Sequence, residues 1–93
     1  MLVSFRDREA ERLFGRIPSR NLPTDIQRAA LRKLRMLNRA TSLRDLKVPP
    51  TNRLEKLRGN RAGQHSIRIN EQWRICFVWR GHDAAHVEIV DYH

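Results

Sequence analysis

The spacing of the apolar residues changes near the middle of the chain, and this change restricts the fold more than any other feature. Up to about residue 40, apolar side chains recur every three or four positions, which is the period of an amphipathic helix. From about residue 64 they alternate with polar residues, which is the period of a strand with one buried face. Helices followed by consecutive strands indicate an α+β fold with an antiparallel sheet.

Two helices are predicted in the first half. Ser4 and Asp7 form a short capping box before a first helix of about three turns. Thr24 and Gln27 form a second box before a longer helix that should end near residue 40. The apolar stripe of this second helix consists of Ile26, Ala30, Leu34 and Leu37.

Strands are predicted in the second half. Residues 65–69 and 73–79 alternate in polarity around a short turn, so they form an antiparallel hairpin. A last strand should cover residues 85–91, and a further strand should precede the hairpin at about residues 54–58. Residues 2–3 can add an edge strand.

One face of this sheet carries Trp73, Ile75, Phe77 and Trp79. Two helices are enough to cover that face, and we expect the arginine-bearing face to stay open. The chain of 93 residues is therefore predicted as a single α+β domain, residues 1–93: a small antiparallel sheet packed on one face by two N-terminal helices.

The balance of charge points to a polyanionic partner. The formal net charge is +9, and 16 of the 19 basic residues are arginine. Guanidinium groups bind phosphate through two parallel hydrogen bonds and stack on bases, so this composition favours nucleic acid. The single cysteine cannot form an internal disulfide, and neither a signal peptide nor a membrane span is recognisable, so we expect a cytoplasmic protein.

The second helix carries a stripe of arginines opposite its apolar one. Asp25 is the only acid between Arg12 and Arg44, so the stripe has few partners with which to form ion pairs. A phosphate backbone would relieve the repulsion, although a solvated helix face needs only water. The stripe consists of Arg28, Arg32, Arg35 and Arg39.

A second group of arginines is predicted on and beside the sheet. Arg68 and Arg74 occupy polar positions on neighbouring strands, and Arg58 and Arg61 lie in the preceding turn. They can bind phosphate together. The alternative for any one of them is an ion pair with a carboxylate across the strands. The candidate carboxylates are Glu55, Glu71 and Glu88.

The last three residues, Asp91, Tyr92 and His93, follow directly on a predicted strand. Pairing of that strand would fix them at the rim of the arginine face; otherwise they are solvated like most chain ends. An imidazole and a phenol beside guanidinium groups could cleave RNA without metal, because the ribose 2'-OH can attack the adjacent phosphate with acid–base help.

Other candidate groups favour structural roles. His82 and His86 are four residues apart, but they lie in a turn and a strand, so a metal site is not expected. Cys76 has no adjacent histidine to activate it. Trp73 and Trp79 share the apolar face and are predicted in the core.

The chain resembles the HigB toxins, the host-inhibition or plasmid-maintenance killer proteins of the RelE/ParE superfamily, in two segments. These are LEKLRGNRAGQHSIRINEQWRICFVW and the terminal VEIVDYH. The resemblance extends over essentially the whole chain, since two helices precede these segments.

The resemblance implies a type II toxin that cuts mRNA in the ribosomal A site, without a cofactor. It also implies a helix-turn-helix antitoxin of the HigA type, through which operator DNA would be bound. Asp91, Tyr92 and His93 match the catalytic end of the family. Arg58 and Arg74 match its basic positions. Glu55 stands where some members have a histidine, and a carboxylate is the weaker base of the two.

Two other functions fit the same fold. A ParE-like toxin would bind DNA gyrase and need no ribonuclease residues. A plain RNA-binding or ribosome-binding module would carry the same charge without catalysis.

Overall fold

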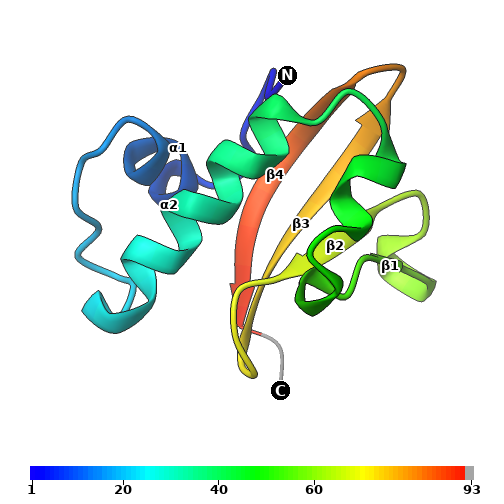
Figure 1. Ribbon diagram of the computed structural model, residues 1–93. Coiled ribbons are helices and arrows are strands. Elements are labelled where there is room, and N and C mark those ends of the chain that lie inside the picture. The colour runs from blue at the N-terminus through cyan, green and yellow to red at the C-terminus, as the bar shows by residue number, and fades with distance from the viewer. Residues whose placement is uncertain (92–93) are drawn as a thin grey trace.

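The chain folds as two helices packed on one face of a four-stranded antiparallel sheet, as the change of apolar period predicts (Figure 1). The computed structural model describes residues 1–91. Its helices are α1 (Arg8–Phe14) and α2 (Thr24–Arg39), with short 3₁₀ helices η1 (Leu43–Lys47), η2 (Pro50–Asn52) and η3 (Gly59–Arg61). Its strands are β1 (Glu55–Lys56), β2 (His65–Arg68), β3 (Trp73–Arg80) and β4 (Asp83–Asp91), in the order β1-β2-β3-β4.

Helix α1 is shorter than predicted and begins later. Its N-cap is Asp7, whose carboxylate accepts a hydrogen bond from the backbone N–H of Glu9. The predicted capping box at Ser4 is wrong, because the Ser4 hydroxyl instead accepts from the backbone N–H of His86 on β4. Residues before Asp7 are therefore part of the sheet's border and not of the helix.

Helix α2 has the predicted bounds but not the predicted cap. Pro23 is its N-cap and no side chain caps its first turn, so the box between Thr24 and Gln27 is wrong. The Gln27 amide instead donates to the carbonyls of Ser19 and Leu22 and accepts from the N–H of Ser19. It thus fastens the connection between the two helices.

The predicted hairpin and last strand are confirmed. Strand β2 pairs with β3 from His65↔Phe77 to Arg68↔Arg74, and β3 pairs with β4 up to Trp73↔Asp91. Gly81 turns between β3 and β4 with φ +62°, a conformation that glycine adopts without steric cost. The predicted strand at residues 54–58 is reduced to the two residues of β1.

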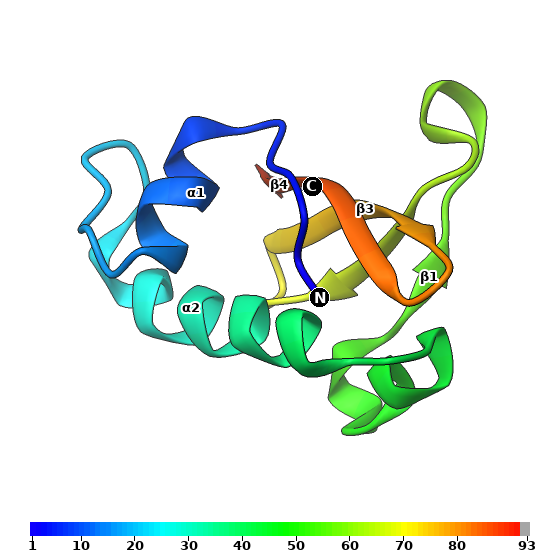
Figure 2. The same cartoon turned by 90° about the horizontal axis from the view of Figure 1, so that it is seen from above.

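The core lies between the helices and the sheet. Ile75 and Phe77 of β3 are fully buried, and Trp73 and Trp79 pack partly buried against the core, which confirms their predicted face. The side chains of α2 that meet the sheet are Ile26, Ala30, Leu34 and Leu37, as predicted. Figure 2 shows both helices on the same side of the sheet.

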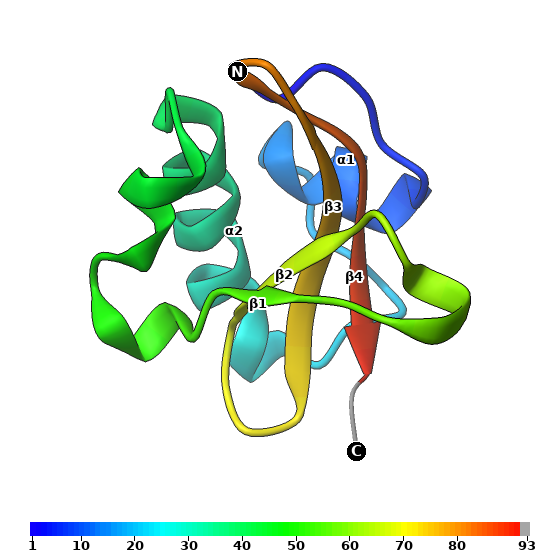
Figure 3. The same ribbon diagram turned by 90° about the vertical axis from the view of Figure 1, so that its right-hand side faces the viewer.

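The opposite face of the sheet is not open, which corrects the sequence-based expectation. Ser66, Arg74 and Cys76 on that face are all buried. In Figure 3, β1 and the chain that follows it pass in front of β3 and β4 on this face, and Arg61 of that chain contacts Glu88 of β4. The sequence pattern did not reveal this cover because its residues are mostly polar.

Residues 2–5 run parallel to β4 and cover its outer border. Isolated bridges join Leu2 to Ala84 and Phe5 to Val87. Backbone hydrogen bonds of 2.9 Å run from Val3 N to the Ala84 carbonyl and from Arg6 N to the Val87 carbonyl. The predicted edge strand is thus present as single bridges.

Candidate functional site

The end of β4 lies beside the turn between β2 and β3. Asp91 is exposed, and its Oδ2 accepts a hydrogen bond of 3.1 Å from Nε2 of Gln72. Asn70 holds the turn, because its Oδ1 accepts from the backbone N–H groups of Gln72 and Trp73. Tyr92 and His93 lie outside the described residues.

Arg74 is the most deeply buried of the predicted phosphate-binding residues, with 7% of it exposed. Its Nε donates to the Ser66 hydroxyl over 2.8 Å, and its Nη2 donates to the Arg53 carbonyl over 2.6 Å. Nη1 lies 3.8 Å from the Glu55 carboxylate, whose side chain is 52% exposed. For Arg74 the cross-strand ion pair expected as the alternative is therefore present.

Arg61 and Glu88 connect the covering segment to β4. Arg61 Nη1 donates to Glu88 Oε2 over 3.0 Å and to Gln64 Oε1 over 3.2 Å, and Arg6 lies 3.6 Å from the same Glu88 oxygen. For Arg61, as for Arg74, the ion pair expected as the alternative is present. Arg58, which precedes η3, is exposed.

Cys76 lies beneath this segment and is shielded from solvent. Burial raises the pKa of its thiol, Glu88 raises it further, and the charges of Arg61 and Arg74 act in the opposite direction. A thiol with a raised pKa is a poor nucleophile, in keeping with the structural role predicted for it.

The histidines of the described chain are separate from one another. The Nδ1 of His82 lies 2.8 Å from the Thr41 carbonyl, and His86 Nε2 lies 3.5 Å from Arg80. His65 stacks on Phe77, and burial together with the charge of Lys56 lowers its pKa. Within residues 1–91, no three His, Cys, Asp or Glu side chains gather where a metal ion could bind.

The arginine stripe of α2 forms a surface of its own. Together with Leu31, the four arginines line a shallow depression of about 300 Å³. None of the four makes an ion pair with another residue among 1–91. The stripe lies on α2, in the helical layer (Figure 1). Arg74 alternates with the core residue Ile75 on β3, so it lies on the opposite face of the sheet, where Arg61 pairs with Glu88 of β4.

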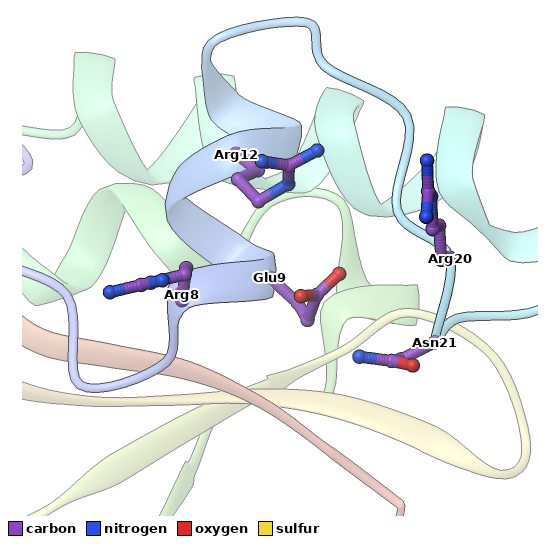
Figure 4. Close-up of a pocket in the computed structure, with 5 residues that line it drawn as sticks. All are labelled: Arg8, Glu9, Arg12, Arg20 and Asn21. Carbon is purple, nitrogen blue, oxygen red and sulfur yellow. The ribbon is translucent and has the colours of Figure 1, made fainter.

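A third basic surface was not predicted from the sequence. It is a depression of about 420 Å³ between α1 and the loop that follows it (Figure 4), lined by Arg8, Glu9, Arg12, Arg20 and Asn21. The Glu9 carboxylate accepts a hydrogen bond from the Ser19 hydroxyl. The four-residue spacing of Arg8 and Arg12 is the one signal that could have indicated this surface.

One depression joins the two predicted arginine groups. Arg32 from the α2 stripe and Arg68 from the sheet both line a hollow of about 340 Å³ next to the β2–β3 turn. The predicted residues are thus distributed over two layers that meet at this point. No helix in the described part of the chain has the length and apolar character required to cross a bilayer.

Two helices on one face of a four-stranded antiparallel sheet form an α+β fold, and this fold is consistent with the RelE-like toxins. A family model described as "RelE-like toxin of type II toxin-antitoxin system HigB" matches residues 3–93. The chain therefore belongs to this family of HigB-like type II toxins, which implies an antitoxin as its partner.

Two relatives show how far the similarity extends. The chain is 40% identical over 80 residues to Toxin HigB-1 of Vibrio cholerae, which covers 85% of this chain and 84% of the relative. It is 31% identical over 63 residues to an uncharacterised protein of Haemophilus influenzae, covering 68% of this chain and 62% of that protein.

Proposed function

We propose that the chain is an endoribonuclease that cuts mRNA on the translating ribosome without a metal ion, and so inhibits translation in the cytoplasm. A HigA-like helix-turn-helix antitoxin would hold it inactive and would supply any contact with operator DNA. The observation that carries the proposal is the pairing of β4 with β3 as far as Asp91. This pairing holds the strand that leads into Tyr92 and His93 against β3, the strand that carries Arg74.

The proposed reaction is an in-line attack of the ribose 2'-OH on the adjacent phosphate. The 2'-oxygen forms a bond to phosphorus while the bond to the 5'-oxygen breaks, leaving a 2',3'-cyclic phosphate and a 5'-hydroxyl. A base takes the 2'-OH proton and an acid supplies a proton to the 5'-oxygen. DNA lacks the 2'-OH, so the substrate of this reaction is RNA.

His93 is proposed to perform one of the two proton transfers, because an imidazole both accepts and donates protons near neutral pH. Tyr92 would stack on a base or position a proton. Glu55 is a candidate for the other proton transfer, since its carboxylate is half-exposed and lies beside the buried Arg74. Asp91 would orient these groups from the end of β4.

Arginines would bind the charged RNA. Arg58 and Arg61 border the sheet face, and Arg68 lies directly across from Arg74 in the β2–β3 register. Guanidinium groups there would stabilise the charge that develops on the phosphate. The α2 stripe would contact RNA of the ribosome or the message.

The test is cleavage of an mRNA in a translating extract, with 5' ends mapped after addition of the parent, His93→Gln or Tyr92→Phe. Arg44→Gln is the control, because Arg44 is exposed on η1 and outside the proposed site. We expect His93→Gln to lower the cutting rate about a hundredfold or more, the range for a lost acid–base group.

Two results would contradict the proposal: cutting by His93→Gln at the parent's rate, or growth arrest with intact mRNA. DNA breaks accompanying intact mRNA would indicate a gyrase inhibitor instead. RNA binding without cutting or growth arrest would indicate a non-catalytic RNA-binding module.

A further inference from the structure

We propose that the hollow shared by α2 and the β2–β3 turn binds a backbone phosphate of the RNA strand, with Lys33 at its centre. We call it the Lys33 pocket. It is lined by Arg32, Lys33, Thr51, Arg68, Ile69 and Asn70 and has a volume of about 340 Å³. The inference rests on the proposed function for the identity of the ligand, and it adds to that function a phosphate site apart from the cleaved linkage.

Lys33 is an unusual member of this set, because only 8% of it is exposed. Its Nζ donates to Oδ1 of Asn52, a neutral acceptor. Within residues 1–91 it forms no ion pair with a carboxylate. A buried ammonium without an anion is costly, and the cost falls when an anion enters the hollow beside it.

Asn52 is fixed and in turn fixes Lys33. It is fully buried, and its Nδ2 donates to the carbonyl oxygens of Leu46 and Val48 over 3.2 and 3.4 Å. These carbonyls belong to η1 and the residue that follows it. The Lys33 side chain is therefore held in one orientation before any ligand binds, which lowers the entropic cost of binding.

Four of the five other lining residues also carry hydrogen-bond donors on their side chains. Arg32 and Arg68 contribute guanidinium groups, and Thr51 contributes a hydroxyl. Asn70 uses Oδ1 for the turn, and its side-chain nitrogen makes no hydrogen bond to another residue among 1–91. No acidic side chain lines the hollow. Several donors with more than one cation are what a phosphate group requires.

The location favours a phosphate of the RNA strand. The turn that contributes Asn70 is bonded to the end of β4 through Gln72 and Asp91. Arg32 is also a member of the α2 stripe, so the pocket connects that stripe with the sheet. A strand that passes the end of β4 would meet the pocket next, whereas free phosphate could enter it without touching either surface.

The experiment is NMR of protein labelled with ¹³C at the lysine ε-carbons. The chain has three lysines, so three signals are expected, and Lys33→Met assigns the buried one. The probes are inorganic phosphate and a single-stranded RNA hexamer without terminal phosphates. We expect the hexamer to shift the Lys33 signal at concentrations where inorganic phosphate does not, and to leave Lys47 and Lys56 unshifted.

Affinity for the hexamer gives the second measurement. Lys33→Met should weaken binding about tenfold, the loss of one charge-assisted hydrogen bond, and lower the salt dependence by about one ion. Lys47→Met is the matched control, since Lys47 is exposed on η1 and outside the pocket, and should bind as the parent does. Arg68→Gln should also weaken binding of the hexamer. This variant tests the pocket if Lys33→Met does not fold.

A Lys33 signal that shifts with neither probe would overturn the proposal. Equal affinity of the parent, Lys33→Met and Arg68→Gln for the hexamer would also overturn it. A response to inorganic phosphate alone would overturn the assignment to RNA. These results are independent of the cutting assay. If the parent cuts mRNA while the hexamer leaves the Lys33 signal unshifted, the pocket is wrong and the proposed function stands. If the hexamer shifts the Lys33 signal while His93→Gln cuts at the parent's rate, the proposed function is wrong and the pocket stands.

Discussion

Arg74 donates a hydrogen bond from Nε to the hydroxyl of Ser66 on the neighbouring strand over 2.8 Å, and both side chains are buried. The same guanidinium reaches the carbonyl of Arg53, which precedes β1. One side chain thus ties β3 to β2 and to the chain entering β1. The geometry depends on the planar fork of a guanidinium, which lysine lacks.

Arg74→Lys should therefore destabilise the fold. We expect a loss of about 1–3 kcal/mol in the free energy of unfolding, because buried hydrogen-bond acceptors lose their donors. Urea unfolding followed by tryptophan fluorescence measures it. Arg80→Lys, an exposed position on the same strand, should change stability by less than about 0.5 kcal/mol. Equal effects of the two substitutions would show that Arg74 has no special structural role.

The buried Lys33 should make stability depend on pH in the alkaline range. Burial, with a smaller contribution from Arg32, lowers the pKa of Lys33 below its ordinary 10.5. Between the lowered pKa and 10.5 the unfolded chain binds more protons than the folded one, so the contribution of Lys33 to stability rises with pH in that window.

Unfolding of the parent and Lys33→Met at about pH 8 and about pH 10 measures this effect. The parent should gain stability relative to Lys33→Met as pH rises. Lys47→Met, which removes the same charge from the surface, should follow the parent at both pH values. A constant difference between the parent and Lys33→Met would show that the ammonium is not desolvated.

The Arg61–Glu88 pair should stabilise the segment that covers the sheet. A double-mutant cycle with Arg61→Gln and Glu88→Gln is expected to give a coupling of about 0.5–1 kcal/mol, since the pair is only partly buried. Hydrogen exchange of residues 57–64 should become faster in either variant. A coupling near zero with unchanged exchange would show that other contacts hold this segment.

The reactivity of Cys76 should show whether residues 57–64 shield this face of the sheet. At neutral pH its alkylation in the folded protein should be at least about a hundredfold slower than in the urea-unfolded chain, because burial excludes the reagent and raises the pKa of the thiol. Arg61→Gln should speed the reaction. Because the chain has one cysteine, Cys76→Ala provides the blank. Alkylation of the folded protein at the unfolded rate would contradict the burial.

Periodicity predicted the main elements because burial imposes it on the sequence. The stripe of α2 and the alternation of β3 each meet one core, so their apolar residues repeat with the geometry of helix and strand. The caps at Ser4 and Thr24 were predicted wrongly. Ser4 accepts from His86 on β4, which is 82 residues away in sequence, and the Gln27 amide is used by the loop before α2 and not by the first turn of the helix.

The candidate site shows the same distinction. The arginines of α2 lie along one stripe that is at least partly exposed throughout, because that requires only the helical period. The burial of Arg74 could not be predicted, because its partners at Arg53 and Glu55 lie outside the hairpin that carries it. The burial of Lys33 could not be predicted either, because its surroundings come from α2, η2 and the β2–β3 turn, which are far apart in sequence.

Residues 2–5 lie parallel to β4 on the side away from β3, and their backbone occupies hydrogen-bonding groups that a strand at the border of a sheet would otherwise present. An unpaired border is a template on which a neighbouring molecule can add a strand, and it promotes aggregation. Residues 2–5 therefore protect β4 from pairing with a second molecule. Deleting them would leave β4, the longest of the described strands, as an unpaired edge strand that favours self-association.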